Sequence, residues 1–429
     1  MLNQKILAVF LSLSMMSLAG CGGGGGGSAT PAPAPTPTPT PTPPAVTNNV
    51  VPISIGTGVS PRYINSLYVT VKICTPGTQN CTSIDRVLLD TGSTGLRIAA
   101  SALPAGFGLP NKVDANNQRY AQCFQFVGGN TWGGIKTADL YMGGEAAQQL
   151  DLQVVDDSSF ASQPTACSNS SASSGNFLSA GVNGILGISS AIQDCGASCS
   201  KTNSLGQPAN PLYYVCTSTQ VCTSITMPLA SQLQNPITRF ASDNNGSVIT
   251  LPAVPAQGTY SVTGSLIFGI GTQSNNGLGN ATVLQVNPGD FTFSADYNNA
   301  TYVDSYMDSG TNLYVIPNAN NAIPTCSDSD AKAKDLFCPT TSLDRSATIF
   351  GQNNLFKVVP FSVANASSLF AQSPTFAVFN NIATASSKST SLETSSFVFG
   401  VPFFLGKTVF TAIEGKTTPS STPTPYVAF

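Results

Sequence analysis

Two short stretches of this 429-residue chain, Val87–Ser93 (VLLDTGS) and Ser305–Thr311 (SYMDSGT), carry most of the information about its fold. Both contain Asp-[Ser/Thr]-Gly-[Ser/Thr] after a partly apolar run, and the pattern occurs at no other position. A single copy is more often a turn, because Asp and Gly favour turns. By chance the composition predicts on the order of 0.1 copies. Two copies, each about midway through its own half, therefore favour a duplicated body.

Asp90 and Asp308 are the candidate catalytic residues of these motifs. If the two loops meet, the carboxylates are too close to ionise together easily, so the pair shares one proton. One carboxylate can then deprotonate a water molecule while the other, protonated, polarises a carbonyl. This chemistry suits a chain without histidine, in which a Ser-His-Asp triad, a Cys-His pair and a His-ligated zinc site are excluded.

At these motifs the chain resembles the pepsin-like aspartic proteases. In that family, two hydrophobic residues and a Gly follow each Asp motif at a distance and thread through the active-site loop. Ile185–Gly187 and Val398–Gly400 match this feature, and their glycines follow Asp90 and Asp308 by 97 and 92 residues. The similar spacing in the two halves supports a duplication of the whole lobe.

The resemblance implies an all-β, bilobal acid protease fold with two duplicated β lobes and few short helices. We assign the N-terminal lobe to residues 49–250 and the C-terminal lobe to residues 251–429. Gly264–Gly269 resembles the family's sheet strand near the lobe junction. The chain also resembles an uncharacterised bacterial family of exported lipoproteins of unknown function.

The resemblance implies a role for each small residue of the two motifs. The hydroxyl residue after Asp cross-links the two loops, the Gly permits a sharp turn, and the next hydroxyl residue bonds the aspartate. The supporting residues are therefore Thr91, Gly92 and Ser93 in the first motif and Ser309, Gly310 and Thr311 in the second.

The flap, a hairpin that covers the cleft in this family, maps to about Phe124–Gly134. A family flap carries a tyrosine that hydrogen-bonds a tryptophan near the first motif. Here the segment has no tyrosine, and the tryptophan position is Arg97. We predict that Phe126 or Trp132 covers the site instead and count Arg97 with the flap and substrate-binding residues. The alternative for Trp132 is a packed hairpin residue.

The first 48 residues predict export and membrane anchoring. Met1–Gly20 has the basic start and short apolar run of a signal peptide, and Leu18–Cys21 (LAGC) resembles the lipobox of bacterial lipoproteins. The resemblance implies cleavage before Cys21 and its lipidation; the alternative is a secreted protein with a chance cysteine. Residues 21–48 form a linker rich in Gly, Pro and Thr. The residue after Cys21 is Gly22 and not the aspartate that is associated with retention in the inner membrane, so analogy favours anchoring in the outer membrane.

Ten cysteines remain when Cys21 is set apart from the total of eleven. An even set in an exported chain suggests disulfides. Metal binding is the weaker interpretation because no histidine assists, and we expect neither a metal nor a cofactor. The shortest spacings favour the pairs Cys74–Cys81, Cys195–Cys199, Cys216–Cys222 and Cys326–Cys338, which leaves Cys123–Cys167.

The rest of the chain predicts strands, because short apolar or alternating runs recur between Gly, Asn, Ser and Pro. Helical periodicity is nearly absent, and Met227–Arg239 and Asp328–Phe337 are the two candidate helices. With 17 Lys and Arg residues and no basic run, we expect no nucleic-acid partner.

These features predict a monomeric, lipid-anchored aspartic endopeptidase that acts on a peptide or protein substrate and contacts the membrane through the lipid on Cys21. Two alternatives remain open. A non-catalytic pepsin-like binding module would hold a peptide, a glycan or a partner protein in the same cleft, as Arg97 and the missing flap tyrosine suggest. In a structural surface lipoprotein, the Asp motifs would be mere turns, and Asp90 would lie far from Asp308.

Overall fold

The computed structural model describes residues 49–56, 64–126, 129–160, 163–167, 181–217, 221–318, 322–386 and 396–429. Residues 47–429 form one compact unit. The predicted signal peptide, Cys21 and the linker lie outside the described residues. The predicted lobe boundary at residue 250 also stays a prediction.

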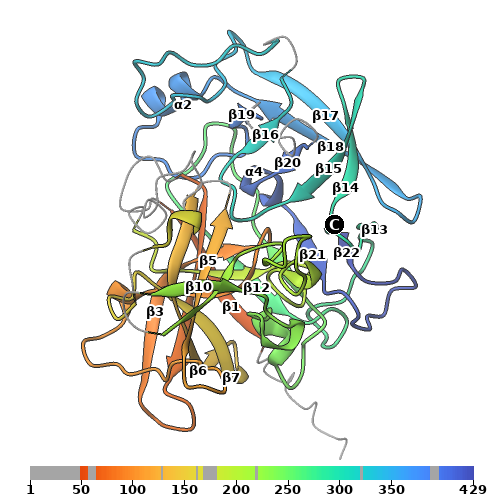
Figure 1. Cartoon of the computed structure of the whole chain (residues 1–429). Helices are drawn as coiled ribbons and strands as arrows, with labels where there is room; N and C mark the ends of the chain where they lie inside the picture. Colours follow the sequence, from red (N-terminus) through yellow and green to blue (C-terminus); the bar gives the residue numbers. More distant parts are fainter. Residues whose placement is uncertain are drawn as a thin grey trace, which may run out of the picture. The chain divides into compact units, whose positions relative to one another are not determined.

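The described residues are mainly strands (Figure 1), which confirms the predicted all-β class. The larger sheet has the order β10-β9-β5-β6-β7-β4-β8-β3-β2-β1-β12-β11-β21-β22-β13. Its strands are β1 Val50–Gly56, β2 Ser66–Cys74, β3 Cys81–Asp90, β4 Thr94–Ala99, β5 Arg119–Phe126, β6 Gly129–Met142, β7 Glu145–Val155, β8 Gly184–Ile188, β9 Tyr213–Cys216, β10 Cys222–Ile225, β11 Gly246–Thr250, β12 Val262–Phe268, β13 Val283–Gln285, β21 Thr408–Ala412 and β22 Tyr426–Ala428.

A second sheet belongs to the C-terminal half and has the order β18-β17-β14-β15-β20-β16-β19. Its strands are β14 Phe293–Tyr297, β15 Ala300–Met307, β16 Tyr314–Ile316, β17 Leu343–Phe350, β18 Phe356–Val363, β19 Ala383–Ala385 and β20 Val398–Phe399.

The two halves repeat one pattern of strand pairing around each Asp motif. In the first half β3 pairs parallel with β8, β8 antiparallel with β4, and β4 parallel with β7. In the second half β15 pairs parallel with β20, β20 antiparallel with β16, and β16 parallel with β19. The strand order and the directions agree, so the backbone itself shows the duplication and the predicted two-lobed architecture.

Additional pairings join the halves and stiffen the first one. A contact between β2 and β6, with Lys72 opposite Tyr141, closes β2, β3, β8, β4, β7 and β6 into a ring, as in a small barrel. Strand β12, which contains most of the predicted junction strand, lies between the N-terminal β1 and β11. Strand β11 then pairs with β21 from the end of the chain.

Helices are short, as predicted, but neither candidate helix forms. Met227–Arg239 contains only two 3₁₀ turns, because Pro236 interrupts it and Asn235 caps the second turn by accepting from the Ile237 amide. Asp328–Phe337 is a set of turns in which the Asp330 carboxylate accepts backbone amides. Among the described residues, the helical segments are η1 Ala100–Ala102, η2 Thr165–Cys167, η3 Gly196–Ser198, η4 Leu229–Ser231, η5 Pro236–Arg239, α2 Ala366–Gln372 and α4 Val401–Phe404.

All five predicted disulfides form. They join Cys74–Cys81, Cys123–Cys167, Cys195–Cys199, Cys216–Cys222 and Cys326–Cys338. Disulfides are typical of proteins exported to oxidising compartments, so the structure supports an exported protein.

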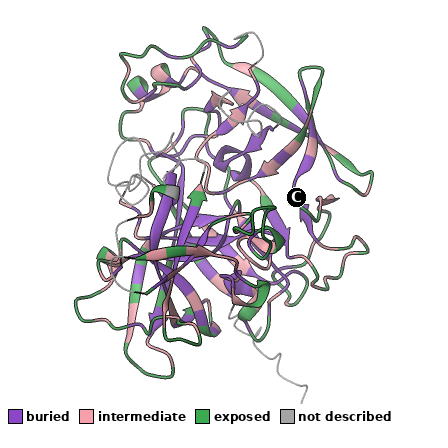
Figure 2. Ribbon diagram, in the orientation of Figure 1, coloured by how far each residue is buried: buried purple, intermediate pink, exposed green. Residues whose placement is uncertain are grey.

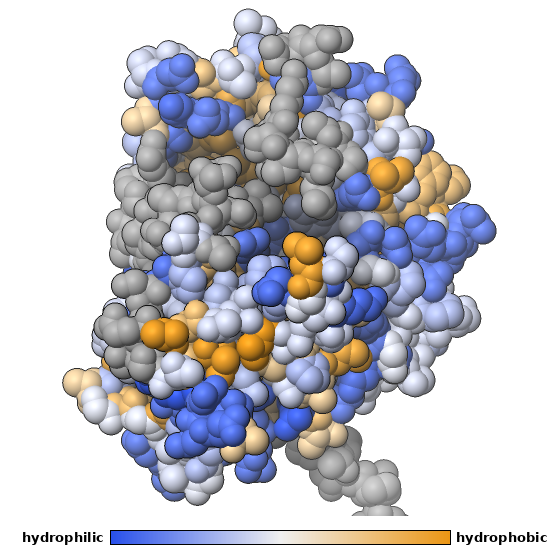
Figure 3. Space-filling model, viewed as in Figure 1, coloured by the Kyte–Doolittle hydropathy of each residue, from blue (hydrophilic) through white to orange (hydrophobic). Residues whose placement is uncertain are grey.

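One large buried apolar cluster includes residues of both halves, such as Leu89 and Phe399. Most strands are buried along much of their length (Figure 2). On the face drawn in Figure 3, hydrophobic residues form small groups separated by hydrophilic ones. Among the described residues, no helix has the length and apolar character needed to cross a bilayer.

Candidate active site

The two motif aspartates stand at equivalent places in the duplicated sheets. Asp90 is the last residue of β3 and lies opposite Gly187 in the parallel neighbour β8. Asp308 follows β15, and its amide donates to the Phe399 carbonyl of the parallel neighbour β20 at 3.0 Å. Both predicted hydrophobic-Gly segments therefore brace an aspartate loop.

Reciprocal hydrogen bonds lock the two loops together. The Thr91 amide donates to Ser309 Oγ at 3.1 Å, and the Ser309 amide donates to Thr91 Oγ1 at 2.9 Å. Each hydroxyl then donates to a carbonyl of the opposite strand, Ser309 to Leu89 at 2.8 Å and Thr91 to Met307 at 3.3 Å. Thr91 and Ser309 are both buried, so these bonds fix the distance between the motifs.

Each carboxylate is held by its own motif in the same way. Ser93 Oγ donates to Asp90 Oδ2 at 2.5 Å, and the Gly92 amide donates to the other oxygen at 2.8 Å. For Asp308 the equivalent donors are Thr311 Oγ1 at 2.6 Å and the Gly310 amide at 2.7 Å. In each aspartate, Oδ1 (the inner oxygen) thus accepts from a backbone amide, and Oδ2 (the outer oxygen) accepts from a hydroxyl.

The motif glycines are required because each faces the opposite aspartate. A Cβ on Gly92 would lie 2.8 Å from Asp308 Cγ, and one on Gly310 would lie 2.7 Å from Asp90 Oδ1 and 3.1 Å from Asp308 Oδ1. The Oδ1 atoms of Asp90 and Asp308 therefore both lie about 3 Å from the position of a Cβ on Gly310, so the two carboxylates are neighbours. This contradicts the alternative in which the motifs are separate turns.

The proximity is reflected in the proton affinity of the pair. Burial, and then the negative charge of Asp90, raise the pKa of Asp308 from 3.8 to about 7. The hydrogen bonds from Thr311 and Gly310 act in the opposite direction but are weaker. Near neutral pH the arrangement therefore favours one proton held by the pair.

Both aspartates line one cavity of about 510 Å³, whose opposite wall includes Phe124, Gln125 and Phe126 of β5. Two neighbouring cavities, of about 570 and 260 Å³, share Gly92 with it. The three spaces therefore adjoin one another around Gly92.

The hairpin of β5 and β6 occupies the predicted flap position, with Phe126 paired to Gly129. Phe126 lines the dyad cavity, as does Phe124, which the sequence did not single out. Trp132 pairs with Cys123 and so points to the opposite face of the hairpin. There it packs edge-on against Tyr214 at 5.2 Å and is 7 % exposed, as in the alternative of a packed hairpin residue.

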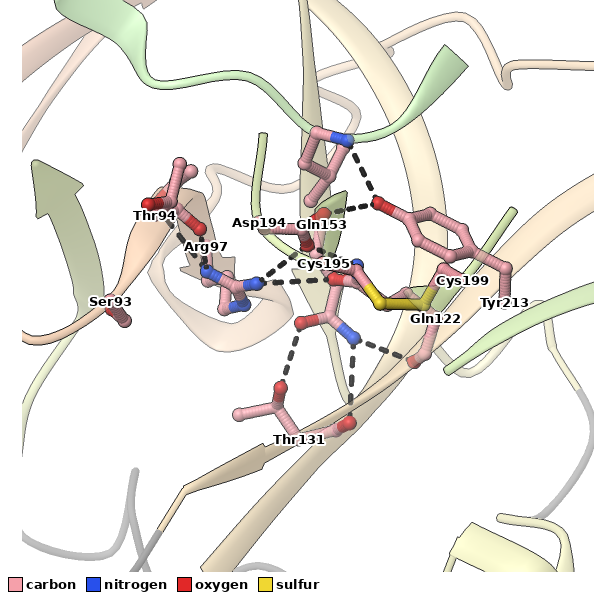
Figure 4. A network of polar contacts seen from close by, with 12 residues as sticks. Ser93, Thr94, Arg97, Gln122, Thr131, Gln153, Asp194, Cys195, Cys199 and Tyr213 are labelled. Atoms are coloured by element: carbon pink, nitrogen blue, oxygen red, sulfur yellow. Dashed lines mark hydrogen bonds and ion pairs between the residues drawn. A yellow bond between two sulfur atoms is a disulfide. The ribbon is translucent and has the colours of Figure 1, made fainter. Parts of the chain in front are cut away.

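Arg97 does not reach the dyad cavity, because it is completely buried beneath the hairpin. Its guanidinium forms an ion pair with Asp194 and contacts Gln122 and the Thr94 carbonyl (Figure 4). No motif singles out Asp194, which lies 97 positions after Arg97. A buried arginine requires a charged or hydrogen-bonding partner, and this requirement could have indicated a buried carboxylate near Arg97.

Within the described part of the chain, no cluster of three or more His, Cys, Asp or Glu side chains could hold a metal ion. The dyad itself has only two carboxylates, and both oxygens of each already accept hydrogen bonds.

The geometry defines a bilobal all-β protein with two neighbouring aspartates at the lobe junction. The chain belongs to a family of proteins of unknown function, DUF3443, which matches residues 45–429. No curated protein matches it. It is similar to the crystal structure of aspartic proteinase from Irpex lacteus, with a TM-score of 0.47 and 16 % identity, over 88 % of this chain and 96 % of that one.

Replacing Ser309 by Ala tests the loop lock. The change leaves the Thr91 amide and the Leu89 carbonyl without their buried partner, so we expect a loss of about 1–3 kcal/mol of unfolding free energy. Urea unfolding at fixed pH measures it. The exposed Ser346 in β17 provides a control, where Ser346→Ala should cost less than about 0.5 kcal/mol. Equal stability of the two variants would contradict the lock.

The raised pKa of Asp308 predicts a pH dependence of stability. Because folding raises this pKa to about 7, the protonated group stabilises the fold fully below its unfolded pKa of about 4. This contribution is lost as the pH rises through 7. Between pH 4 and 8, the unfolding free energy of the natural protein should therefore fall relative to that of Asp308→Asn. Parallel curves would show that Asp308 has an ordinary pKa.

Proposed function

We propose that this protein is an extracytoplasmic aspartic endopeptidase of the pepsin-like type, anchored to a membrane by a lipid on Cys21. The observation that carries the proposal is the aspartate pair, held by mirrored hydrogen bonds on the wall of an open cavity. A pair with a raised pKa in a cavity is a candidate for acid–base chemistry.

In the proposed reaction, ionised Asp90 accepts a proton from a water molecule whose oxygen attacks the carbonyl carbon of a peptide bond. Neutral Asp308 donates its hydrogen to the carbonyl oxygen as the double bond opens. The tetrahedral intermediate then breaks at the C–N bond. The proton from Asp90 moves to the leaving nitrogen, and Asp308 regains its proton as the new carboxyl group forms.

The substrate class follows from the shape of the site. An extended peptide can occupy these adjoining cavities, and its backbone can hydrogen-bond to the hairpin, as peptides do when they add to strands. Phe124 and Phe126 would then contact apolar side chains next to the cleaved bond. This supports a peptide or an unfolded protein segment as the substrate.

A non-catalytic peptide-binding module is the second candidate. The observation that favours it is the hairpin, whose cavity-lining residues Phe124, Gln125 and Phe126 include no tyrosine. Such a module would bind a peptide that mimics the transition state equally well with either aspartate replaced. An enzyme would need both.

Asp90→Asn should abolish cleavage of an unfolded protein, with a loss of at least about 10³-fold in kcat/KM, because the variant lacks the base that activates water. Asp344→Asn, at an exposed position in β17, is the matched control and should retain full activity. Product formation is followed by mass spectrometry. Undiminished cleavage by Asp90→Asn would exclude the mechanism, and no cleavage by the natural protein would favour the binding module.

The activity should decline above about pH 7, because Asp308, whose pKa is raised to about 7, then loses the proton it must donate. The kcat/KM profile between pH 3 and 9 measures this limb. Since the chain has no histidine, an ordinary imidazole cannot produce it. A flat profile through pH 8 would contradict the assignment of Asp308 as the acid.

Cys21→Ser tests the proposed anchor separately from the chemistry. In a bacterial host the natural chain should sediment with the membrane fraction and carry acyl groups at Cys21, whereas the variant should not be acylated there. Mass spectrometry of the N-terminal peptide is the measurement. An unmodified Cys21 in the mature natural protein would leave a secreted enzyme without an anchor.

A further inference from the structure

Arg97 is a buried charge that the proposed reaction does not explain. Its side chain and that of Asp194 are both 0 % exposed, and their charged groups are 3.1 Å apart. Removing two ions from water costs several kcal/mol per ion unless excellent geometry and further hydrogen bonds compensate. The surroundings must therefore hold this pair in one arrangement.

Asp194 is held from both sides (Figure 4). Tyr213 Oη donates to its Oδ1 at 2.6 Å, and Gln122 Nε2 donates to its Oδ2 at 2.5 Å. The tyrosine oxygen in turn accepts from the Leu233 amide at 2.8 Å. Because both carboxylate oxygens are engaged, Asp194 cannot turn away, and it fixes the plane of the Arg97 guanidinium.

That plane supports the wall of the dyad cavity. The guanidinium carbon lies 3.7 Å from the ring centre of Phe124 and 5.6 Å from that of Phe126. These rings pack on one another at 4.8 Å, and both line the cavity that contains the aspartates. A buried guanidinium over an aromatic ring contributes about 0.5–2 kcal/mol, so Arg97 holds the two rings in place.

Arg97 also contacts the loop that carries the dyad. Its Nη1 donates to the Thr94 carbonyl at 2.8 Å, and the preceding Ser93 donates to Asp90. Burial lowers the pKa of Arg97, while attraction by Asp194, Tyr213 and Asp90 opposes this effect. The same side chain therefore contacts the loop that holds Asp90 and the rings that line the cavity.

We propose that Arg97 is a positioning residue of the active site, which holds Phe124 and Phe126 over the dyad and ties them to the loop that carries Asp90. One side chain thereby couples the shape of the substrate cleft to the position of that loop. The inference rests on the proposed function for its catalytic meaning. Its two physical parts can be measured without any cleavage.

Three variants separate these parts. Arg97→Lys keeps the charge but loses the flat guanidinium that stacks on the rings. The double variant Arg97→Met/Asp194→Asn removes both charges, so that no unpaired ion is left buried. Arg119→Lys is the matched control. Arg119 lies in β5, the strand that carries Phe124 and Phe126, and its guanidinium lies 4.4 Å from the ring centre of Phe160, outside the dyad cavity.

The first measurement is the titration of the dyad by NMR of the ¹³C-labelled aspartate carboxyl groups, assigned with Asp308→Asn. In the double variant the Thr94 carbonyl loses its buried donor, which loosens the loop from which Ser93 donates to Asp90. The dyad should then titrate at higher pH than in the natural protein, because a hydrogen bond that stabilises the ionised carboxylate is weakened. The titration of the dyad should not shift in Arg97→Lys, whose ammonium can still donate to that carbonyl, or in Arg119→Lys. An unchanged titration in a folded double variant would overturn the tie to the Asp90 loop, whether or not the protein cleaves anything.

The second measurement is amide hydrogen exchange of residues 119–126, combined with binding of a statine-containing peptide. Arg97→Lys should speed amide exchange around Phe124. It should also weaken binding of the peptide, or raise KM, about three- to tenfold, with a smaller change in kcat. Exchange and KM equal to those of Arg119→Lys would overturn the support of the rings. If the natural protein neither binds the peptide nor cleaves, the proposed function fails, and exchange and titration still decide the role of Arg97.

Discussion

The close approach of two carboxylates is the constraint on which the structure depends. Two ionised groups at this distance repel, and burial makes their charges still less stable. The protein holds them together with four hydrogen bonds between Thr91, Ser309 and the strands beneath them. Since each loop supplies half of these bonds, neither lobe can build the site alone. The duplication and the site are thus two consequences of one arrangement.

The hairpin above the dyad has more support than an isolated two-stranded flap. Strand β5 pairs with β6 on one side and with β9 on the other, and Cys123–Cys167 ties it to the following loop. Cys216–Cys222 closes the β9–β10 hairpin at its edge. These constraints favour a cleft that is formed before the substrate arrives. Binding then requires less ordering of the protein.

The sequence predicted the dyad and the disulfides because both depend on short local patterns. An Asp-Thr-Gly sequence predicts a turn, and two cysteines a few positions apart predict a disulfide, almost regardless of the surrounding fold. The Arg97–Asp194 pair depends on contacts between segments with no fixed spacing in the sequence, so no sequence pattern predicts it. Trp132 was ambiguous for a related reason, since one position along a strand decides which face a side chain occupies. The predicted helix at Met227–Arg239 does not form because Pro236, in its interior, outweighs its apolar spacing.

The buried pair beneath the hairpin is better explained by positioning than by stability. Apolar residues of similar volume often stabilise a core as well as a buried ion pair does, so stability alone does not require Arg97 and Asp194. Apolar residues, however, have no preferred orientation toward an aromatic ring and no charge that acts on a carboxylate. The guanidinium supplies both, because it is planar and always charged. A chain that replaces the flap's hydrogen bond with stacked rings needs such a group under them, next to the loop that carries Asp90.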